Sequence, residues 1–340
     1  MPVPSLILRA CLCLLLAGAL GVSATRARAQ PRDATLQIAT WNLEWLMTPQ
    51  THAALRLHCV PEGESGASVR SIPCDVARQR SRGREDFDKL AEYATRLDAD
   101  VIAIQEVDGP EAAKLVFRDH DFCFTARRAV QNTGFAIRRG RGIRFRCDGD
   151  FEPLALHHSH LRAGAQLTLF AGSADELHLL GVHLKSGCAG QRLDQPLQAC
   201  ELLSQQVAPL KTWVDARARA GQRFMLLGDF NRRLAQERGR PRDGSGRLVR
   251  MWPALDQPDV TGADLNAITQ GRAYIKCRIT ERHGAYIDHI IAGERAADRW
   301  LTESFRRVGY APVDAARWML SDHCPMSIRY RLVGSDGRGG

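Results

Sequence analysis

The feature of this sequence that most limits its fold is a series of short apolar runs with catalytic-type polar residues beside them. The runs that are candidate strands are 36–41, 101–105, 134–138, 166–171, 177–184, 223–227, 286–292 and 326–332. Two longer segments, 85–98 and 200–220, repeat apolar residues at helical spacing, and Pro209 is expected to kink the second one. Short strands combined with helices in a chain of this length predict an α/β fold.

Acidic, amide and imidazole side chains lie at six of these runs. The first run leads to Asn42, the second to Glu106, and the fifth holds His183 and leads to Lys185. The other three segments are GDFN with Asp229 and Asn231, YIDHII with Asp288, and LSDHCP with Asp322 and His323. A single residue of this kind is ordinarily a turn, a cap or a satisfied core group. Six clusters, most of them at carboxyl ends of strands, predict a site along one sheet edge.

The acids and amides suit the hydrolysis of a phosphate ester. A phosphodiester is an anion, so attack by water requires charge neutralisation, and a hard divalent cation for this purpose prefers carboxylate oxygens such as those of Glu106. Asp229 is suited to orient and deprotonate the water. The amides of Asn42 and Asn231 can hydrogen-bond to water or phosphate without adding negative charge.

The imidazoles suit the other side of the same reaction. His323 or His183 can stabilise charge on the phosphate or protonate the leaving oxygen. An aspartate beside an imidazole fixes its tautomer and raises its pKa, which is a role open to Asp288. His157, His158 and His160 lie close together in the sequence, and a solvated loop or strand end explains them better than a metal site.

Taken in order, these segments resemble the endonuclease/exonuclease/phosphatase superfamily, which includes pancreatic-type deoxyribonucleases, abasic-site endonucleases, neutral sphingomyelinases and inositol-polyphosphate 5-phosphatases. The resemblance runs from TWNLEWL at Asn42, through IAIQEV and GDFN, to SDHCP at His323. It implies a four-layer α/β sandwich with two central, mainly antiparallel sheets flanked by helices. It also implies a site that depends on Mg²⁺, with Mn²⁺ or Ca²⁺ as alternatives.

The resemblance further implies roles for single residues of this chain. The residues assigned to the metal are Asn42, Glu106 and Asp322. The residues assigned to catalysis are His183, Asp229, Asn231, Asp288 and His323. The residues assigned to substrate binding are Asn42, Asn132 and Lys185.

His183 narrows the choice within the family. Abasic-site endonucleases carry a tyrosine in this region, whereas deoxyribonuclease-like and sphingomyelinase-like members carry a histidine, so VHLKSGC disfavours abasic-site repair. A second catalytic histidine also requires an acidic partner. The sequence does not single one out, and Asp119, Asp121 and Glu152 are the candidates.

The chain begins with a segment that predicts export. Arg9 precedes an uncharged run over 10–22, and Ala27-Arg28-Ala29 fits a cleavage site, so residues 1–29 are expected to be a signal peptide rather than a membrane anchor. The endonuclease/exonuclease/phosphatase domain is expected over 30–333, followed by a disordered Gly-rich tail over 334–340. The mature chain is expected to be periplasmic or secreted and to contain no transmembrane segment.

Eight cysteines remain after the predicted signal, an even number that favours disulfides in an exported chain. Eight cysteines allow 105 pairings. We expect the sequential one: Cys59–Cys74, Cys123–Cys147, Cys188–Cys200 and Cys277–Cys324.

The charge balance favours a polyanionic substrate only weakly. Removal of Arg9, Arg26 and Arg28 with the signal lowers the net charge from +9 to +6. Three polar stretches, 52–83, 138–146 and 232–250, hold many of the arginines. They are most simply solvated loops, but they would contact phosphates if they lined the site.

The sequence therefore predicts an exported, metal-dependent phosphodiesterase, with a nuclease acting on DNA or RNA as the leading hypothesis. One alternative is a sphingomyelinase-like enzyme or another small phosphate-ester hydrolase. Another is a catalytically silent binding protein on the same fold, whose mark would be loss of Glu106, Asp229 or His323. No stable protein partner is expected.

Overall fold

The computed structural model describes Met1 and the ranges 34–61, 70–158, 160–256, 260–278, 281 and 284–333. Apart from Met1, the predicted signal peptide over 1–29 lies outside the described residues, as does the predicted tail over 334–340. The described residues from 34 onward belong to one unit, Asp33–Gly340. No helix within the described ranges is long and apolar enough to cross a membrane.

Two six-stranded sheets lie at the centre of this unit. The first has the order β11–β12–β1–β2–β4–β3 and consists of β1 (Thr35–Leu46), β2 (Val101–Val107), β3 (His120–Phe124), β4 (Asn132–Arg138), β11 (Arg306–Arg307) and β12 (Met326–Arg331). The second has the order β5–β6–β7–β8–β10–β9 and consists of β5 (Phe145–Phe151), β6 (Gly164–Leu169), β7 (Leu177–His183), β8 (Phe224–Asp229), β9 (Leu265–Ala267) and β10 (Asp288–Gly293).

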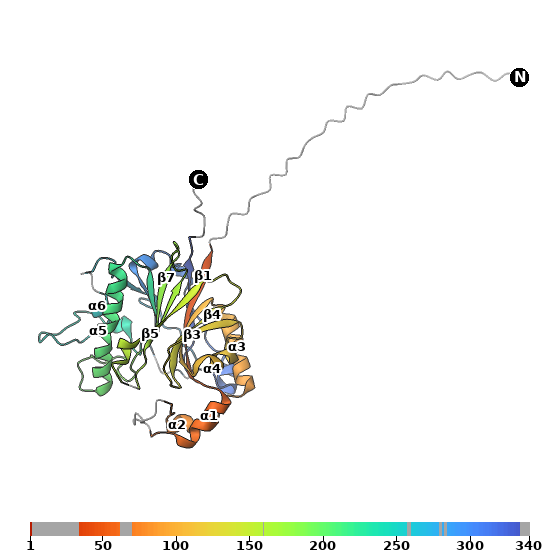
Figure 1. The fold of residues 1–340 in the computed structure, drawn as a ribbon, viewed down its shortest axis with the longest axis horizontal. Helices are drawn as coiled ribbons and strands as arrows, with labels where there is room; N and C mark the ends of the chain where they lie inside the picture. The colour runs from red at the N-terminus through yellow and green to blue at the C-terminus, as the bar shows by residue number, and fades with distance from the viewer. Residues whose placement is uncertain are drawn as a thin grey trace. The chain divides into compact units, whose positions relative to one another are not determined.

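Helices cover the outer faces of the two sheets. The α-helices are α1 (Pro49–Leu55), α2 (Cys74–Arg78), α3 (Arg84–Leu97), α4 (Gly109–Val116), α5 (Gln198–Arg219), α6 (Trp252–Leu255), α7 (Glu294–Ala297) and α8 (Pro312–Arg317). Short 3-10 turns are η1 (Arg56–His58), η2 (Glu152–Ala155), η3 (Leu234–Gln236) and η4 (Thr302–Ser304). Figure 1 shows α3 and α4 on one side of the paired sheets and α5 and α6 on the other. The predicted four-layer α/β sandwich is thereby confirmed.

The hydrophobic core has three main parts, which correspond to the three interfaces between the layers. Side chains of both sheets, such as Phe135, Leu179 and Ile328, pack together between the sheets. Leu90 of α3 packs with the first sheet, and Leu210 of α5 packs with the second. The sheets are thus buried on both faces, which explains why their strands read as nearly continuous apolar runs.

The strand directions explain why polar residues gather at one edge. β1 pairs with β2 in parallel, β7 pairs with β8 in parallel, and all other ladders between the described strands are antiparallel. The carboxyl ends of the parallel pairs lie at the same edge, where Asn42 stands opposite Gln105 and His183 opposite Asp229. The antiparallel neighbours β4, β10 and β12 begin at this edge. Residues at their amino ends are therefore brought to the same place.

All eight predicted strands and both predicted helices are present, with shifted ends. The continuous helix α5 includes Pro209. The strands that the sequence did not reveal are β3, β5, β9 and β11. Most residues of β5, whose sequence is FRCDGDF, are exposed or half-buried, so β5 lacks the apolar pattern on which the prediction relied.

The four expected disulfides, Cys59–Cys74, Cys123–Cys147, Cys188–Cys200 and Cys277–Cys324, are all present.

The three arginine-bearing stretches were expected to be solvated loops, but two of them contain a buried arginine. Arg82 is buried and donates to the carbonyl oxygens of Glu44, Met319 and Leu320. Arg232 is also buried and pairs with Glu237. These two arginines hold loops together and are not available to phosphates.

Asp86 at the start of α3 gives a test of this packing. Its carboxylate accepts hydrogen bonds from the backbone N–H of Gly83 at 2.8 Å, from that of Met319 at 2.7 Å, and from Arg80 Nη2 at 2.8 Å. Burial alone would raise the pKa of Asp86, but these donors lower it to about 2.

We expect Asp86→Ala to lower the free energy of unfolding by about 2 kcal/mol, because a helix cap and a charged hydrogen-bond network are lost together. Since the folded pKa lies below the unfolded one, this stabilisation is present above about pH 4 and is lost as the pH falls towards 2. Urea unfolding at pH 7 and pH 3 measures both effects. Asp88→Ala, an exposed position on the same helix, is the control, and an equal loss in the two variants would contradict the prediction.

Candidate active site

Four of the predicted residues meet at the carboxyl ends of the two parallel strand pairs. Asn42 Nδ2 donates to Glu106 Oε1 and to Asp229 Oδ2, each at 3.1 Å. His183 Nε2 lies 3.6 Å from the same two oxygens. Asn42, His183 and Asp229 are at most 4% exposed. One amide and one imidazole therefore join carboxylates from different sheets.

The carboxylate of Glu106 is held in one orientation. Its Oε2 accepts hydrogen bonds from the backbone N–H of Trp45 at 3.2 Å and from Gln131 Nε2 at 2.5 Å, which leaves Oε1 towards Asn42 and His183. Glu44, Trp45 and Glu106 adopt positive φ angles of 46°, 51° and 61°, a strained conformation for residues other than glycine. This strain directs the N–H of Trp45 at the acid. The sequence pattern did not identify Gln131, because it precedes its strand rather than following one.

His183 is neutral in this setting. Burial lowers its pKa well below the ordinary value, and the charge of Arg162 lowers it further. Its Nδ1 is buried without a hydrogen-bond partner in the described part of the chain. None of the proposed acidic partners, Asp119, Asp121 and Glu152, is seen to contact it in the described residues; Asp121 pairs instead with Arg139. The acids that face His183 are Glu106 and Asp229.

Asp229 has the environment of a proton acceptor. Burial raises its pKa to about 7, although the charge of His323 opposes the change. Its Oδ1 accepts the backbone N–H of Asn231 at 2.7 Å, and Asn231 Nδ2 donates to the carbonyl of Leu184 at 3.1 Å. The Asn231 side chain therefore lies between β8 and the end of β7, beside the carboxylate.

His323 and Asp288 form a second imidazole–carboxylate unit. His323 Nδ1 lies 2.7 Å from Asp288 Oδ2, and His323 Nε2 lies 3.8 Å from Asp229 Oδ2. Burial would lower the pKa of His323, but the charge of Asp288 outweighs it and raises the pKa well above the ordinary value. The pKa of Asp288 is lowered in turn, because His323 overcomes the effect of its burial. This histidine is therefore a cation, unlike His183.

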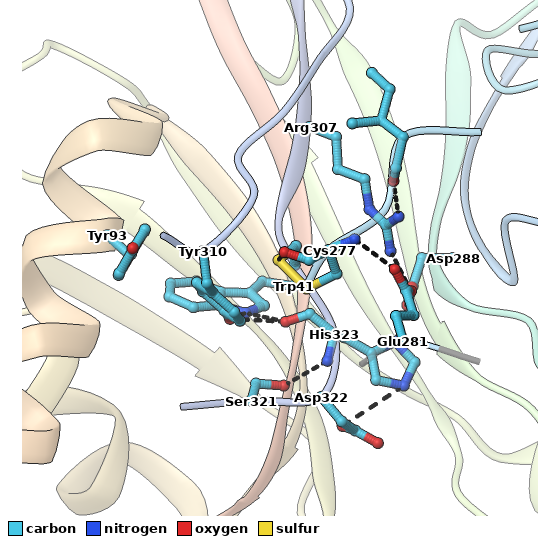
Figure 2. The surroundings of a disulfide bond; sticks show 12 residues. Trp41, Tyr93, Cys277, Glu281, Asp288, Arg307, Tyr310, Ser321, Asp322 and His323 are labelled. Carbon is cyan, nitrogen blue, oxygen red and sulfur yellow. Dashed lines mark hydrogen bonds and ion pairs between the residues drawn. A yellow bond between two sulfur atoms is a disulfide. The ribbon is translucent and has the colours of Figure 1, made fainter. Parts of the chain in front are cut away.

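Contacts from several elements fix the backbone at His323, as Figure 2 shows. The carbonyl oxygen of His323 accepts hydrogen bonds from Tyr310 Oη at 2.7 Å and Trp41 Nε1 at 3.2 Å. Its N–H donates to Ser321 Oγ at 3.0 Å, and the next residue, Cys324, is bonded to Cys277. The imidazole is thus presented by a loop with little freedom to move.

Asp322 lies at the rim of this site. Its backbone N–H donates to Glu44 Oε2 at 2.8 Å, and its carboxylate lies 3.9 Å from His323 Nε2 with 47% of the side chain exposed. Burial and the charge of Asp322 raise the pKa of Glu44 to about 7. Within the described ranges no contact joins Asp322 to Glu106, so the three residues predicted to bind metal are not all in contact.

The two remaining predicted residues, Asn132 and Lys185, are set apart from the centre. Asn132 Nδ2 donates to the carbonyl of Ala129 at 2.7 Å, and its buried Oδ1 has no described partner. Lys185 Nζ donates to the carbonyl of Ser186 at 3.0 Å. The sequence also missed Arg162, whose charge acts on both Glu106 and Asp229. Its signal was weak, since it stands among ordinary loop residues before β6.

The donors at the centre fit a hard divalent cation. Glu106 Oε1 is the carboxylate oxygen left open by Trp45 and Gln131, and oxygen ligands of this kind suit Mg²⁺. Asn42 would offer Oδ1 after its amide rotates, because that oxygen now accepts the N–H of Glu44 at 3.0 Å.

Asp229, Asp288 and His323 have potential ligand atoms within 4.8 Å of one another. A protonated imidazole has no lone pair to offer a metal, and Asp288 favours the protonated form of His323. Glu106 with Asn42 is therefore the better cation site of the two.

The Cys277–Cys324 bridge supplies a prediction about the His323 loop. The two cysteines are 47 positions apart, so their replacement by alanine should lower the free energy of unfolding by about 4 kcal/mol, measured by urea unfolding. It should also lower kcat by roughly tenfold, because catalysis depends on the exact placement of the imidazole. Alanine at Cys188 and Cys200 is the control: it should destabilise the fold with a smaller effect on kcat. An equal effect on kcat would contradict a specific role for the first bridge.

Comparisons with known proteins agree with the fold. A sequence model described as the Endonuclease/Exonuclease/phosphatase family matches residues 39–323. Truncated Caenorhabditis elegans TDP2 is similar in structure, with a TM-score of 0.52, 13% identity, and coverage of 88% of this chain and 98% of that chain. D. rerio TDP2 complexed with a single strand DNA product has a TM-score of 0.53, 14% identity, and coverage of 88% and 100%. No curated protein matches the sequence.

Proposed function

Since the chain belongs to the Endonuclease/Exonuclease/phosphatase family, we propose that it is an exported, metal-dependent phosphodiesterase and, within that class, a nuclease that hydrolyses DNA or RNA. Hydrolysis of phosphate esters is the chemistry that this family shares. The finer assignment, to nucleic acid and to a metal, rests on the residues at the site.

The observation that carries the proposal is the meeting of four strand ends around Asn42. They bring together two carboxylates, a neutral imidazole and an imidazolium that is bound to a third carboxylate. The contacts that link these groups, directly or through Asn42, span 3.1 to 3.8 Å. A structural role explains each residue singly. It does not explain why two carboxylates lie side by side, because the hydrogen bonds that orient them leave the repulsion between them in place.

The proposed metal ligands are Glu106 and Asn42, with Asp322 at the rim as a third. A bound divalent cation would neutralise charge on the phosphate and polarise its P–O bonds. Gln131 and Trp45 keep Oε2 of Glu106 occupied, so that Oε1 remains directed at the site.

Asp229 is the proposed general base. With a pKa of about 7 its carboxylate can accept a proton from water near neutral pH, and Asn42 and Asn231 fix its two oxygens. The Asn231 amide is placed beside it to orient the attacking water. His183 remains neutral and can hydrogen-bond to the phosphate or water through Nε2.

The Asp288–His323 pair is proposed to act on the phosphate side. Asp288 holds His323 protonated at Nδ1, so its Nε2–H can donate to a phosphoryl oxygen or to the leaving oxygen as charge develops there. Lys185 and Asn132 are proposed substrate contacts beside the centre.

Export is supported by two independent features. Four disulfides close loops in different parts of the chain, and such bonds persist in oxidising compartments. The N-terminal pattern over 1–29 predicts a signal peptide. We therefore propose that the domain over 30–333 functions in the periplasm or outside the cell.

A sphingomyelinase-like activity is the main rival, because the same chemistry serves any phosphodiester. The exposed large apolar residues of the described chain, such as Leu57, Leu197 and Val313, come from different segments, which gives no evident membrane-contact loop. The structure of D. rerio TDP2 with a single strand DNA product makes DNA the first substrate to test. A silent binding protein is disfavoured because Glu106, Asp229 and His323 are all retained.

One assay separates these functions. The purified chain over 30–340 is incubated with plasmid DNA, RNA and sphingomyelin in Mg²⁺, Mn²⁺, Ca²⁺ or EDTA, beside Glu106→Gln. We expect metal-dependent cleavage of nucleic acid by the unmodified chain. Glu106→Gln should require a higher metal concentration, which calorimetry with the metal alone measures independently. Turnover of lipid without cleavage of nucleic acid would refute the nuclease proposal, and no turnover of any ester would favour the silent binder.

A further inference from the structure

A group of basic side chains lies beside the candidate active site and is only partly used by the roles given above. The cationic cluster, as we call it, consists of Arg127, His160, Arg162 and Lys185. These residues come from three segments of the chain, before β4, before β6 and after β7. Like charges brought together repel one another, so a fold that gathers them commonly binds an anion there.

Arg162 is the member nearest the reaction centre. Its Nη2 donates to the carbonyl of Leu184 at 3.1 Å, and the same carbonyl accepts Asn231 Nδ2 at 3.1 Å. Its Nε is buried and has no partner among the described residues. Burial lowers the pKa of Arg162, while Glu106 and Asp229 oppose the change. The guanidinium thus lies beside Asn231 and keeps an unused donor.

Lys185 and Arg127 both interact electrostatically with Arg162. Burial lowers the pKa of both side chains, that of Arg127 to about 10, and in each the charge of Arg162 lowers the pKa further. The two acids that act on Arg162 do not act on them appreciably. His160 completes the cluster, because its pKa is lowered by burial and then by neighbouring cations, Lys185 among them. These four side chains therefore form one group of positive charge beside the reaction centre.

Two members of the cluster have no carboxylate bound to them among the described residues. Neither Arg162 nor Lys185 forms an ion pair with a carboxylate anywhere in the described ranges. Their side chains donate to the backbone carbonyls of Leu184 and Ser186. This differs from the surface arginines of the same protein, many of which are paired with aspartate, such as Arg138 with Asp98. A buried guanidinium donor without a described partner and an ammonium without a carboxylate partner, both beside a phosphate-ester site, are suited to bind an anion.

We propose that the cationic cluster binds a second phosphate group of the substrate, next to the phosphate that is hydrolysed. The inference rests on the proposed function and narrows its substrate to a polynucleotide. Guanidinium and ammonium groups are the side chains that bind phosphate oxygens best. A nucleic acid presents a further phosphate one nucleotide away from the scissile one. Sphingomyelin carries a single phosphate and would leave the cluster empty.

The test compares compounds with one and two phosphates. The ligands are a dinucleoside monophosphate and the same compound with an added phosphate at its 5′ or 3′ end. A further version, in which the added phosphate carries a methyl ester, distinguishes binding of a diester from binding of a terminal monoester. Affinity is measured by calorimetry in EDTA, and kcat/KM is measured with Mg²⁺. The proteins are the unmodified chain, Arg162→Gln, Lys185→Gln and Arg219→Gln. Arg219, an exposed arginine at the end of α5, is the matched control. The chain after Arg219 enters the amino end of β8, whereas the site lies at the carboxyl end of that strand.

We expect the unmodified chain to bind one of the two-phosphate compounds at least about 10-fold more tightly than the one-phosphate compound. Arg162→Gln and Lys185→Gln should each remove most of this preference, and Arg219→Gln should keep it. The proposal is overturned if the unmodified chain shows no preference, or if the variants weaken both classes of compound equally. Binding is measured without turnover. Absence of cleavage would therefore count against the proposed function, while the binding measurement would still test the second phosphate site.

Discussion

Replacement of Asp229 by asparagine should lower kcat by at least about 100-fold, the usual effect of removing a general base. The carboxylate accepts hydrogen bonds at both oxygens, from Asn42 Nδ2 at 3.1 Å and from the N–H of Asn231 at 2.7 Å. An asparagine has one acceptor and one donor, so it must point an N–H at one of these donors. The variant therefore loses the base and also disturbs the residues that orient the water.

Stability should change in the opposite direction, which separates a catalytic effect from a folding defect. Because the folded pKa of Asp229 is raised to about 7, its ionised form is disfavoured in the folded protein, and the cost is fully present above that pH. At pH 8 the Asp229→Asn variant should therefore have a Tm equal to or above that of the unmodified chain, and the difference should shrink as the pH falls towards 4.

The measurements are kcat by steady-state cleavage of DNA and Tm by calorimetry at pH 8 and pH 5. Asp215→Asn is the matched control, because Asp215 is also largely buried but pairs with Lys211 on α5. This variant should keep kcat. If Asp229→Asn retains more than a tenth of kcat, Asp229 is not the base.

The part of the fold that the sequence predicted is the part whose strands are buried on both faces. β2, β7 and β8 read as nearly continuous apolar runs, and polar residues at their carboxyl ends identified Glu106, His183 and Asp229 directly. β5 is an edge strand with mostly exposed or half-buried residues, so no apolar pattern marked it. The failure to predict β3, β5, β9 and β11 did not affect the prediction of the site, because the site residues come from the central strands and the loops beside them.

The site residues that the sequence missed act through the geometry of loops. Gln131 reaches Glu106 only because β4 runs antiparallel to β2 and begins where β2 ends. Arg162 reaches the centre because the loop before β6 passes beside the end of β7, where both Arg162 and Asn231 bind Leu184. The spacing of residues along the sequence does not reveal such contacts. In contrast, the pairing of Asp288 with His323 agrees with the role that the family resemblance implied.

The sequence also did not reveal which arginines are buried. Arg82 and Arg232 stand in polar, arginine-bearing stretches, as solvated residues do, yet each is buried and satisfies several backbone or carboxylate oxygens. A guanidinium can be buried when all its donors are used, which depends on loops far apart in the chain. The phosphate contacts proposed above therefore come from Arg162 and Lys185, outside the three stretches that the sequence indicated.

Removal of His323 should have the second large effect, and it can be separated into two parts. We expect His323→Ala to lower kcat by at least about 100-fold, because the cation that faces the phosphate is lost. It should also lower the free energy of unfolding by about 3–5 kcal/mol, since Asp288 is left as a buried, unpaired carboxylate. Urea unfolding and steady-state cleavage measure the two effects on the same protein.

The double variant His323→Ala with Asp288→Asn resolves them. Neutralising Asp288 removes the unpaired charge, so the double variant should regain most of the stability lost by His323→Ala, while kcat stays low. As a control, His178 pairs with Glu176 at 2.8 Å on β7 but at the opposite end of that strand from His183. His178→Ala should therefore leave kcat within about threefold, as expected for a site that touches no reacting group. Recovery of kcat in the double variant would show that His323 acts by stabilising the loop and not as the phosphate-facing cation, because only a loss of structure can be repaired by neutralising its buried partner.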